Sequence, residues 1–309
     1  MSAYERARKS ERNVANGREK MKLKKLVNTF LVILLMLNLC FVFVPFDIEI
    51  REVKAQEDDW YWINDSWINV TTTDYFNISI QRSRNWIRHY YWKNRNSGEW
   101  VDIYDGGHPL VQTETETWQY KCPNSESYIL LNTSDILVVA SNATRWDWNG
   151  TCRYVFWKDI PWFLADIAFI ANDNTSVSIQ ADVFGNADKF GKDSPGLCGI
   201  TENGTINTLG TGAAQFPLPK NNSQQEFPWF CYRNNKQNWT MGFILADIYP
   251  RFGYWKALYA GLEVQLTASS AFNRKGQIYR TKWLIYPHLT DGYTNDNYYQ
   301  KTRDLAQDL

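Results

Sequence analysis

The chain has 309 residues, of which 44% are hydrophobic and 16% aromatic, and its 33 basic residues balance 33 acidic ones. This composition excludes a disordered chain, and the low content of 17 Gly and 10 Pro excludes a collagen-like or linker-like one. A nucleic-acid-binding protein would show a basic excess, so no nucleic-acid partner is expected. What remains is a globular protein with an unusual content of 15 Trp.

The first 46 residues predict a membrane segment. Residues 1–25 carry nine Lys or Arg and three Glu, a local charge of +6, and are expected to form a basic cytoplasmic segment. Residues 26–46 contain no charged residue, and 21 helical residues at about 1.5 Å each would span roughly 31 Å, the thickness of a bilayer's hydrocarbon core. We expect a single-pass transmembrane helix, then a stalk at residues 47–59, then one domain at residues 60–309 outside the cell membrane.

A cleaved signal peptide is the alternative. Translation starting at Met21 would give a basic region before residues 26–46, and small residues allow cleavage after Ala55, which would secrete the domain. Both interpretations export the domain. Ten Asn-x-Ser/Thr sequons follow residue 56, about three times as many as composition predicts, and they favour a glycoprotein over a surface merely rich in turns. They are Asn64, Asn69, Asn77, Asn132, Asn142, Asn149, Asn174, Asn203, Asn221 and Asn238.

The cysteines agree with export. Cys40 lies in the predicted span, which leaves Cys122, Cys152, Cys198 and Cys231 outside. Four cysteines in an oxidising compartment predict two disulfides with three possible connectivities. We favour the pairing of sequence neighbours, Cys122 with Cys152 and Cys198 with Cys231. No Cys-x-x-Cys pair is present, so no zinc site is expected.

From Trp60 onward, apolar and polar residues alternate with the period of half-buried strands. The predicted strands are 68–72, 76–80, Asn85–Trp92, Trp100–Tyr104, Tyr128–Ala140, Arg153–Trp157, Phe163–Ile170, Ser176–Phe184, Trp239–Ile248, Ala257–Thr267 and Gln277–Tyr286. About eleven short strands without interleaved helices predict a mainly β fold, a large antiparallel β-sandwich or a barrel. Residues 185–226 lack apolar periodicity and are expected to have no regular structure. Residues 295–309 predict a short C-terminal helix with Tyr298, Thr302, Leu305 and Leu309 near one face.

Residues 145–163 hold the densest aromatic cluster, with four Trp among Arg and Asp. A flat indole can pack on the C–H face of a sugar while charged side chains bond its hydroxyls, so this mixture predicts a glycan or polysaccharide ligand. The predicted ligand-binding residues are Trp146, Trp148, Trp157, Asp159, Trp162, Tyr254 and Trp255. Trp60, Trp62 and Trp67 form a second aromatic cluster. The alternative is that these rings only fill the core.

Candidate catalytic residues are few. His108 follows a turn sequence, His288 ends a predicted strand, and the third histidine is His89. His108, His288 and Arg145 are therefore the candidates for acid–base chemistry and for charge stabilisation. Residues 291–297 are rich in oxygen ligands and could hold calcium, although the order of an EF-hand is absent. No other cofactor is expected.

The segments 154–163, 242–244 and 279–286 resemble strands of the large β-sandwiches in the galactose-mutarotase-like group. That group includes aldose epimerases and the sandwich domains of polysaccharide lyases and hydrolases. The resemblance implies a carbohydrate-active sandwich over residues 60–290. The epimerases use histidines and a glutamate on facing strands, a set that has no clear counterpart here, so no site residue is carried over.

Two functions follow from these patterns. The first is a membrane-anchored, extracytoplasmic protein that binds or modifies carbohydrate; a lyase would use a Tyr or His to remove a proton beside a uronate carboxylate that Arg or Lys neutralises. The second is a structural or adhesive cell-surface glycoprotein without a ligand. They differ in whether Trp146, Trp148, Trp157 and Trp162 line an exposed face or fill the core.

Overall fold

The computed structural model describes residues 60–309, except for 72–74, 84–85, 95–96, 105–109, 113–125, 145–147, 173, 178–179, 185–194, 201–205, 210–213, 218–226, 228, 235–238, 248–253, 259–262, 268–270 and 290–297. The chain forms two units. Residues 55–307 make up the β-structured unit, and residues 1–54 with Asp308 and Leu309 make up the other.

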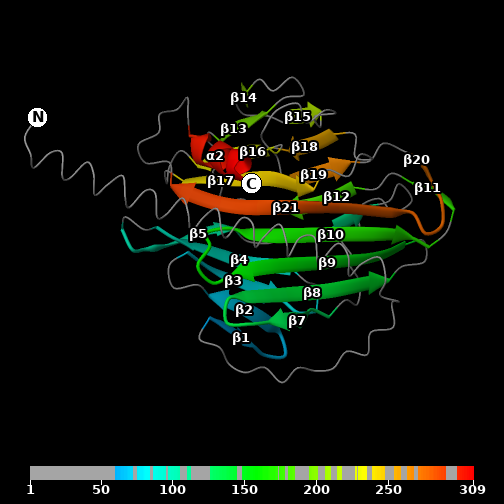
Figure 1. Ribbon diagram of the computed structural model, residues 1–309, viewed down its shortest axis with the longest axis horizontal. Helices are drawn as coiled ribbons and strands as arrows, with labels where there is room; N and C mark the ends of the chain where they lie inside the picture. The colour runs from blue at the N-terminus through cyan, green and yellow to red at the C-terminus, as the bar shows by residue number, and fades with distance from the viewer. Residues whose placement is uncertain are drawn as a thin grey trace, which may run out of the picture. The chain divides into compact units, whose positions relative to one another are not determined.

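The first five strands form an antiparallel sheet in chain order, called the N-terminal sheet below (Figure 1). In β3 every second side chain is buried, as the alternation of Phe76, Ile78 and Ile80 with polar residues requires. Register shifts between Ser79 and Ile80 and between Tyr90 and Tyr91 interrupt the pairing of β4 with its neighbours. The strands are β1 (Tyr61–Ile63), β2 (Trp67–Thr71), β3 (Phe76–Gln81), β4 (Trp86–Lys93) and β5 (Trp100–Tyr104).

A nine-stranded antiparallel sheet, the large sheet, has the order β14-β13-β16-β17-β21-β10-β9-β8-β7. Its longest strand, β21, pairs with β10 on one side and β17 on the other. The strands are β7 (Tyr128–Asn132), β8 (Ile136–Thr144), β9 (Trp148–Trp157), β10 (Phe163–Ala171), β13 (Pro195–Ile200), β14 (Ile206–Leu209), β16 (Trp229–Asn234), β17 (Trp239–Asp247) and β21 (Ile278–Leu289).

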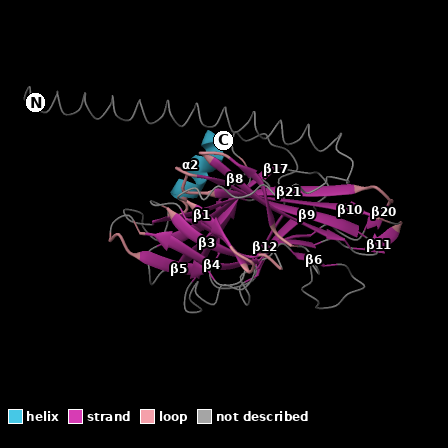
Figure 2. Ribbon diagram, turned by 90° about the horizontal axis from the view of Figure 1, so that it is seen from below, coloured by secondary structure: helices cyan, strands magenta, loops and turns pink. Residues whose placement is uncertain are grey.

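Two further sheets complete the described strands. One has five strands in the order β15-β18-β19-β12-β6, and the other pairs β11 with β20. In Figure 2 the sheet containing β6 and β12 lies in the same layer as the N-terminal sheet, facing the large sheet. The strands are β6 (Leu110–Gln112), β11 (Thr175–Val177), β12 (Gln180–Phe184), β15 (Ala214–Pro217), β18 (Tyr254–Leu258), β19 (Glu263–Thr267) and β20 (Ala271–Asn273).

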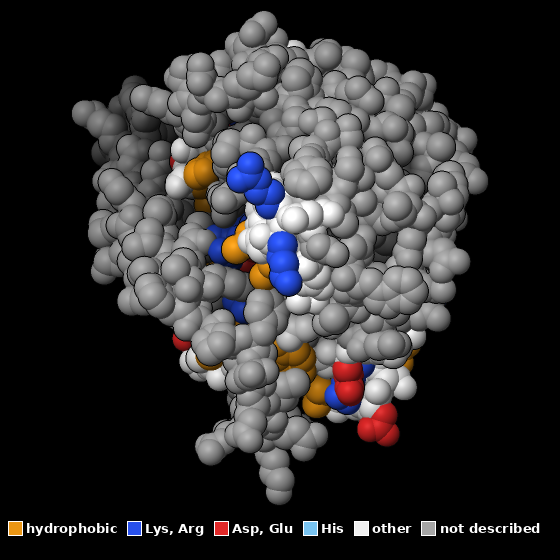
Figure 3. Space-filling model, turned by 90° about the vertical axis from the view of Figure 1, so that its right-hand side faces the viewer, with side chains coloured by type: hydrophobic (Ala, Val, Ile, Leu, Met, Phe, Trp, Pro, Cys, Tyr) orange, Lys and Arg blue, Asp and Glu red, His pale blue; other side chains and the backbone are white. Residues whose placement is uncertain are grey.

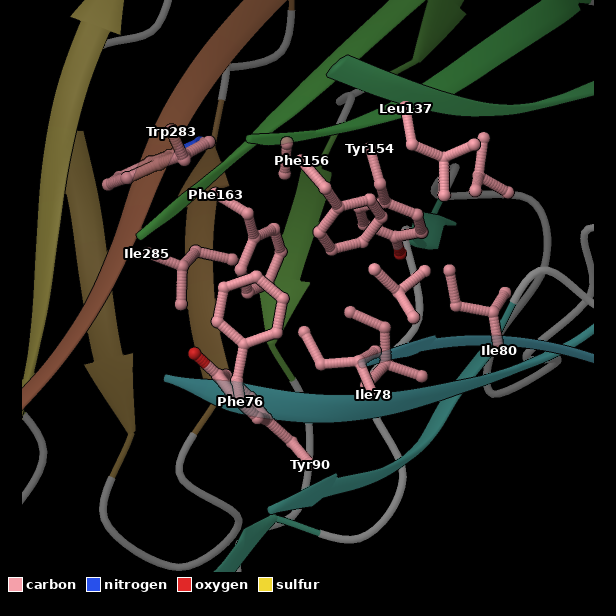
Figure 4. Packing of buried hydrophobic residues seen from close by; sticks show 14 of the residues in the cluster. Phe76, Ile78, Ile80, Tyr90, Leu137, Tyr154, Phe156, Phe163, Trp283 and Ile285 are labelled. Carbon is pink, nitrogen blue, oxygen red and sulfur yellow. The ribbon is translucent and has the colours of Figure 1, made fainter. Parts of the chain in front are cut away.

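Aromatic side chains fill the space between the N-terminal sheet and the large sheet (Figure 4). Phe76 lies 5.9 Å from Phe156, and Tyr90 lies 5.7 Å from Phe163, measured between ring centroids. Each fully buried aromatic side chain contributes about 1.5–3 kcal/mol of transfer free energy. The described residues therefore form a β-sandwich, which confirms the mainly β antiparallel prediction.

One helix, α2 (Gln300–Asp308), packs on the face of the large sheet that points away from the N-terminal sheet. The ring of Tyr299 stacks on Trp229 of β16 at 5.4 Å. A Cβ atom at Gly242 would meet the hydroxyl oxygen of Thr302 at 2.3 Å, so only glycine allows this close approach. The C-terminal helix predicted from residue 295 is confirmed with a later start, and its buried positions include Thr302 and Ala306.

The strand prediction was correct in kind but too low in number. The described residues hold 21 strands, not about eleven, because turns divide three predicted segments and because β1, β6, β13 to β16 and β20 lie outside the predicted segments. Tyr128–Ala140, for example, splits at Thr133, whose hydroxyl accepts a hydrogen bond from the backbone N–H of Ile136.

The absence of regular structure predicted for residues 185–226 is wrong. Strands β13, β14 and β15 lie there. These strands are short and show little apolar alternation. They form because β13 pairs with β16 and β15 pairs with β18, and such pairing with distant strands is not visible in the local sequence pattern.

Among the described residues, no helix has the length and hydropathy needed to cross a bilayer. Residues 26–46 are outside the described part of the chain, so the transmembrane helix stays a prediction.

Candidate functional site

The outer face of the N-terminal sheet collects aromatic side chains. Strand alternation sends Ile68, Ile78 and Tyr90 into the core, so their neighbours in β2, β3 and β4 point the other way. We call this surface the aromatic face, and its residues are Trp62, Trp67, Asn69, Ser79, His89, Tyr91, Lys93 and Trp100.

Strand register places these side chains in a continuous path. Asn69 of β2 lies between Trp62 of β1 and Ser79 of β3, and Ser79 in turn pairs with His89 of β4. The Trp67 ring centroid lies 6.3 Å from that of His89. His89 stacks on Tyr91 two residues further along β4, at 6.0 Å and an interplanar angle of 20°. Rings from β2 and β4 thus cover the middle of the sheet.

Both ends of the path are open to solvent. Trp62 is 48% exposed and Trp100 is 42% exposed, and they lie on opposite edges of the sheet, in β1 and β5. The ammonium of Lys93 lies 5.7 Å from the centroid of the Trp100 ring, in the range of a cation–π contact. Exposed apolar residues on soluble proteins usually occur singly. A row of aromatic rings that crosses a whole sheet is therefore typical of a binding surface.

A polar pair lies between the rings. The Ser79 hydroxyl donates a hydrogen bond to Asn69 Oδ1 at 2.5 Å. Asn69 is only 6% exposed, and no described residue accepts a hydrogen bond from its Nδ2. A buried amide donor without an acceptor costs about 1–3 kcal/mol, and because this Nδ2 is enclosed, it is not available to a ligand on the surface. The face can therefore stack on a flat apolar surface, and the partly exposed ammonium of Lys93 beside Trp100 can donate hydrogen bonds.

The predicted aromatic cluster is divided by the structure. Trp157 and Trp162 are buried and pack edge to face, with ring centroids 5.1 Å apart. A ligand cannot stack on a buried ring, so the burial of Trp157 and Trp162 favours a packing role for both. Asp159, in the turn between β9 and β10, is exposed. Trp148 begins β9, but its side chain, like all of Arg145 and Trp146, falls outside the described part.

Two other predicted ligand residues, Tyr254 and Trp255, begin β18 and pair with Pro217 and Phe216 of β15. Their side chains are not among those described, so their role stays a prediction. The same holds for His108 and for residues 291–297, the calcium candidate, which lie outside the described residues.

His288 is enclosed between β21 and α2. Its Nδ1 donates to the carbonyl of Leu289 at 3.2 Å, and its Nε2 accepts from the Thr302 hydroxyl at 2.9 Å. Burial lowers the pKa of His288 to about 3, against the raising effect of the Leu289 hydrogen bond, and the nearby charge of Lys301 lowers it further. The neutral ring therefore holds the helix on the sheet, and acid–base catalysis near neutral pH would need a pKa closer to 7.

The cysteines fall in two places. Cys198 of β13 and Cys231 of β16 are direct cross-strand partners, but Cys231 forms no disulfide in the structure, so the predicted pairing of these two cysteines is not observed. Cys152 of β9 lies in the core between the sheets and forms no disulfide either, so the predicted pairing with Cys122, which is outside the described residues, is not observed.

The sequons differ in their surroundings. Asn64, Asn142 and Asn174 are exposed, as a glycan requires. Asn69 is buried and its Nδ2, the atom that would carry a sugar, is enclosed, which argues against a glycan at this position in the folded chain. Asn77, Asn132 and Asn149 are partly buried, and the remaining predicted sites, Asn203, Asn221 and Asn238, lie outside the described residues.

Sequence reasoning noted Trp62 and Trp67 but missed Tyr91 and Trp100. The available signal was the alternation in β4, where Tyr90 and Trp92 are buried and Tyr91 and Lys93 point outward. Only the register of five strands brings these residues onto one surface.

No protein-family model matches the chain, and no curated protein matches its sequence. Solved structures do match. A galactose mutarotase-like protein from Clostridium acetobutylicum has 8% identity and a TM-score of 0.47, over 75% of this chain and 100% of that one. A galactose mutarotase-like protein from Lactobacillus casei has 9% identity and a TM-score of 0.46, over 72% and 100%.

A proposed aldose 1-epimerase from Klebsiella pneumoniae has 8% identity and a TM-score of 0.50, over 81% of this chain and 92% of that one. At this level of identity the match concerns the fold alone. It confirms the resemblance expected from the sequence: the chain is similar in fold to galactose mutarotase-like and aldose 1-epimerase structures.

Proposed function

We propose that this protein is an exported, membrane-anchored carbohydrate-binding protein, and that the aromatic face holds the sugar. The observation that carries the proposal is the row of exposed and half-buried rings across the N-terminal sheet, with the Asn69 and Ser79 pair between them. Sugars present flat C–H faces edged by hydroxyls. Rings bind the faces, and the Lys93 ammonium beside Trp100 binds the hydroxyls.

The fold supports the same ligand class. The matching Klebsiella pneumoniae structure is described as a proposed aldose 1-epimerase, a name that refers to a sugar substrate. A fold does not determine a function by itself, so the function must be inferred from the residues of the site. Here the fold and the chemistry of the aromatic face point to the same class of ligand.

Export rests on the sequence. The basic segment, the apolar run at 26–46 and the sequons together favour an anchored domain outside the cell membrane, and a secreted form cut after Ala55 is the alternative. Exposed sequons at Asn64, Asn142 and Asn174 are consistent with a glycoprotein.

A screen of the full chain in detergent micelles against immobilised glycans tests the proposal. We expect binding to one class of glycan, and we expect Trp62→Ala and Trp100→Ala each to weaken it at least tenfold. Removing a central ring at an interface typically costs about 2 kcal/mol or more, and 1.4 kcal/mol corresponds to tenfold. Trp62→Phe keeps a ring and should retain part of the affinity.

Leu131→Ala is the matched control. Leu131 is 44% exposed on β7 of the large sheet, so this substitution removes an exposed apolar side chain outside the aromatic face. It should bind like the unmodified protein. Absence of binding to every glycan by a well-folded sample would instead support the structural or adhesive role.

A further inference from the structure

The two exposed tryptophans of the aromatic face are too far apart to contact the same sugar unit. Trp62 lies in β1 and Trp100 in β5, with three strands between them. Neighbouring strands are about 4.8 Å apart, so these two edge strands are separated by roughly 19 Å. Register adds an offset along the strands. Trp62 is in line with His89 across β2 and β3, whereas Trp100 pairs with Lys93, which follows His89 by two outward positions of β4.

Further rings occupy the interval between the two tryptophans. The ring centroids of Trp67 and His89 are 6.3 Å apart, and those of His89 and Tyr91 are 6.0 Å apart. These three side chains are half-buried, so each keeps part of its surface in water. The ammonium of Lys93, the next outward residue of β4, lies over the ring of Trp100. Aromatic surface is therefore available at several steps along the face and not only at its two ends.

The spacing of the rings is close to the spacing of the units in a polysaccharide. A hexose ring, built from bonds of about 1.5 Å, advances an extended chain by roughly 5 Å per unit. The strand spacing of about 4.8 Å and the centroid distances of 6.0 and 6.3 Å are similar to this repeat. A chain that reaches from β1 to β5 therefore needs about four units.

The outward positions of β2 and β3, in the middle of the face, carry no charge. Their side chains are those of Trp67, Asn69, Thr71, Asn77, Ser79 and Gln81. Those of Thr71 and Gln81 are half-buried, and hydroxyl and amide groups both donate to and accept from sugar hydroxyls. An acidic sugar would find no cation at these positions, so the middle of the face fits a neutral chain better.

Among the described residues, exposed rings of this size occur only on the N-terminal sheet. The other exposed large apolar side chains are aliphatic, namely Leu130 and Leu131 of β7 and Ile278 of β21. Figure 3 faces the end of the molecule that carries the β20–β21 hairpin, and Lys or Arg side chains project there. Aliphatic and cationic side chains lack the flat face on which a sugar ring packs, so the aromatic face is the described surface best suited to a glycan chain.

We propose that the aromatic face binds an extended, neutral chain of at least about four hexose units, which lies across the strands from Trp62 to Trp100. This deepens the proposed function and rests on it for the class of ligand. Equatorial linkages keep a hexose chain extended, whereas axial linkages coil it. An extended chain contacts several rings at once, because after the first contact the others form at a high effective concentration. Chain length and chain shape therefore determine the affinity.

Titration calorimetry of the full chain, in micelles of a detergent without a sugar headgroup, tests the inference. The ligands are cellobiose, cellotetraose, cellohexaose and maltohexaose. We expect the affinity to rise at least about tenfold from cellobiose to cellotetraose, since the longer chain reaches additional rings. Maltohexaose has the same sugar and the same number of units as cellohexaose but forms a coiled chain, so it should bind at least about tenfold more weakly.

Two variants test where the chain lies. Trp62→Ala and Trp100→Ala each remove one end of the path, so each should weaken the binding of cellohexaose at least about tenfold. Cellobiose reaches only one end, so no more than one of the two variants should weaken its binding. Leu131→Ala is the control outside the aromatic face and should keep the full rise of affinity with chain length.

The series on the unmodified protein decides the matter even where a variant fails to fold. Equal affinity for cellobiose and cellohexaose, equal affinity for cellohexaose and maltohexaose, or no binding of any of the four ligands would overturn the inference. The proposed function would survive these results if another immobilised glycan bound and required Trp62 or Trp100. A well-folded sample that binds no glycan in the screen would overturn both.

Discussion

The two outer faces of the sandwich obey the same β alternation but are built differently. The outer face of the N-terminal sheet presents rings that remain partly in water, whereas that of the large sheet encloses charged groups and is partly covered by α2. A substitution on the first face removes a contact that the fold does not need. A substitution on the second removes a partner from a buried charge or from the helix. A substitution on the aromatic face can therefore test the proposed binding without changing stability, whereas a substitution on the outer face of the large sheet changes stability.

The largest effect is expected at the buried ion pair. Asp166→Asn removes the carboxylate charge that accepts two hydrogen bonds from the enclosed Arg280 guanidinium. Breaking a buried pair from one side costs about 3–5 kcal/mol, so the free energy of unfolding in urea should fall by that amount. Asp159→Asn, an exposed carboxylate, is the control and should change it by less than about 0.5 kcal/mol. A loss at Asp166 no larger than at Asp159 would show that the pair is not buried in solution.

A smaller loss is expected where the helix meets the sheet. Gly242→Ala places a Cβ against the Thr302 side chain, and overpacking of this kind costs about 1–3 kcal/mol. Thermal unfolding should report the loss. Adding Thr302→Ala to the variant should recover part of it by removing the atoms that clash. Unchanged stability in the single variant would mean that α2 lies further from β17 than described.

The helix contact also predicts a dependence on pH. The folded pKa of His288, about 3, lies below the ordinary value of 6.5, so the unfolded state takes up a proton first as the pH falls. The contribution of His288 is fully present above about pH 6.5 and is lost progressively between pH 6.5 and 3, at up to about 1.4 kcal/mol per pH unit. Urea titrations at several pH values should show a shallower slope for His288→Gln. Parallel slopes would place the histidine in water.

The smallest effect on stability is expected on the aromatic face. Trp62→Ala and Trp100→Ala remove exposed rings and should each change the free energy of unfolding by within about 0.5 kcal/mol. Urea unfolding followed by far-ultraviolet circular dichroism avoids the change in Trp fluorescence. A loss comparable to that of Asp166→Asn would remove the distinction between the two faces.

The sequence predicted those parts of the fold that local patterns determine. Alternation in Phe76–Gln81 defined a half-buried strand, and the spacing of Tyr298 and Thr302 indicated a helix face. Strands β13 to β15 could not be predicted, because pairing with distant strands defines them. Trp157 and Trp162, which were predicted as ligand-binding residues, are buried. Their burial depends on contacts with other parts of the chain, which their own segment does not show.

The buried ion pair and the candidate site depend even more on register. Asp166 and Arg280 are 114 positions apart in sequence and meet only because β10 pairs with β21. Trp62, His89 and Trp100 share a surface because β1 to β5 pair in chain order. The two register shifts in this sheet could not be predicted from the residue types. Composition indicated a sugar ligand, and the arrangement of strands selects which aromatic residues can bind it.

The central claim is that exposed rings of the N-terminal sheet bind carbohydrate. The most direct measurement is titration calorimetry of the full chain and of the double variant Trp62→Ala/Trp100→Ala with the glycan that the unmodified protein binds best, alongside thermal unfolding of both. The account predicts that the double variant melts within a few degrees of the unmodified protein and loses at least a hundredfold in affinity. Undiminished affinity in the folded double variant would contradict it.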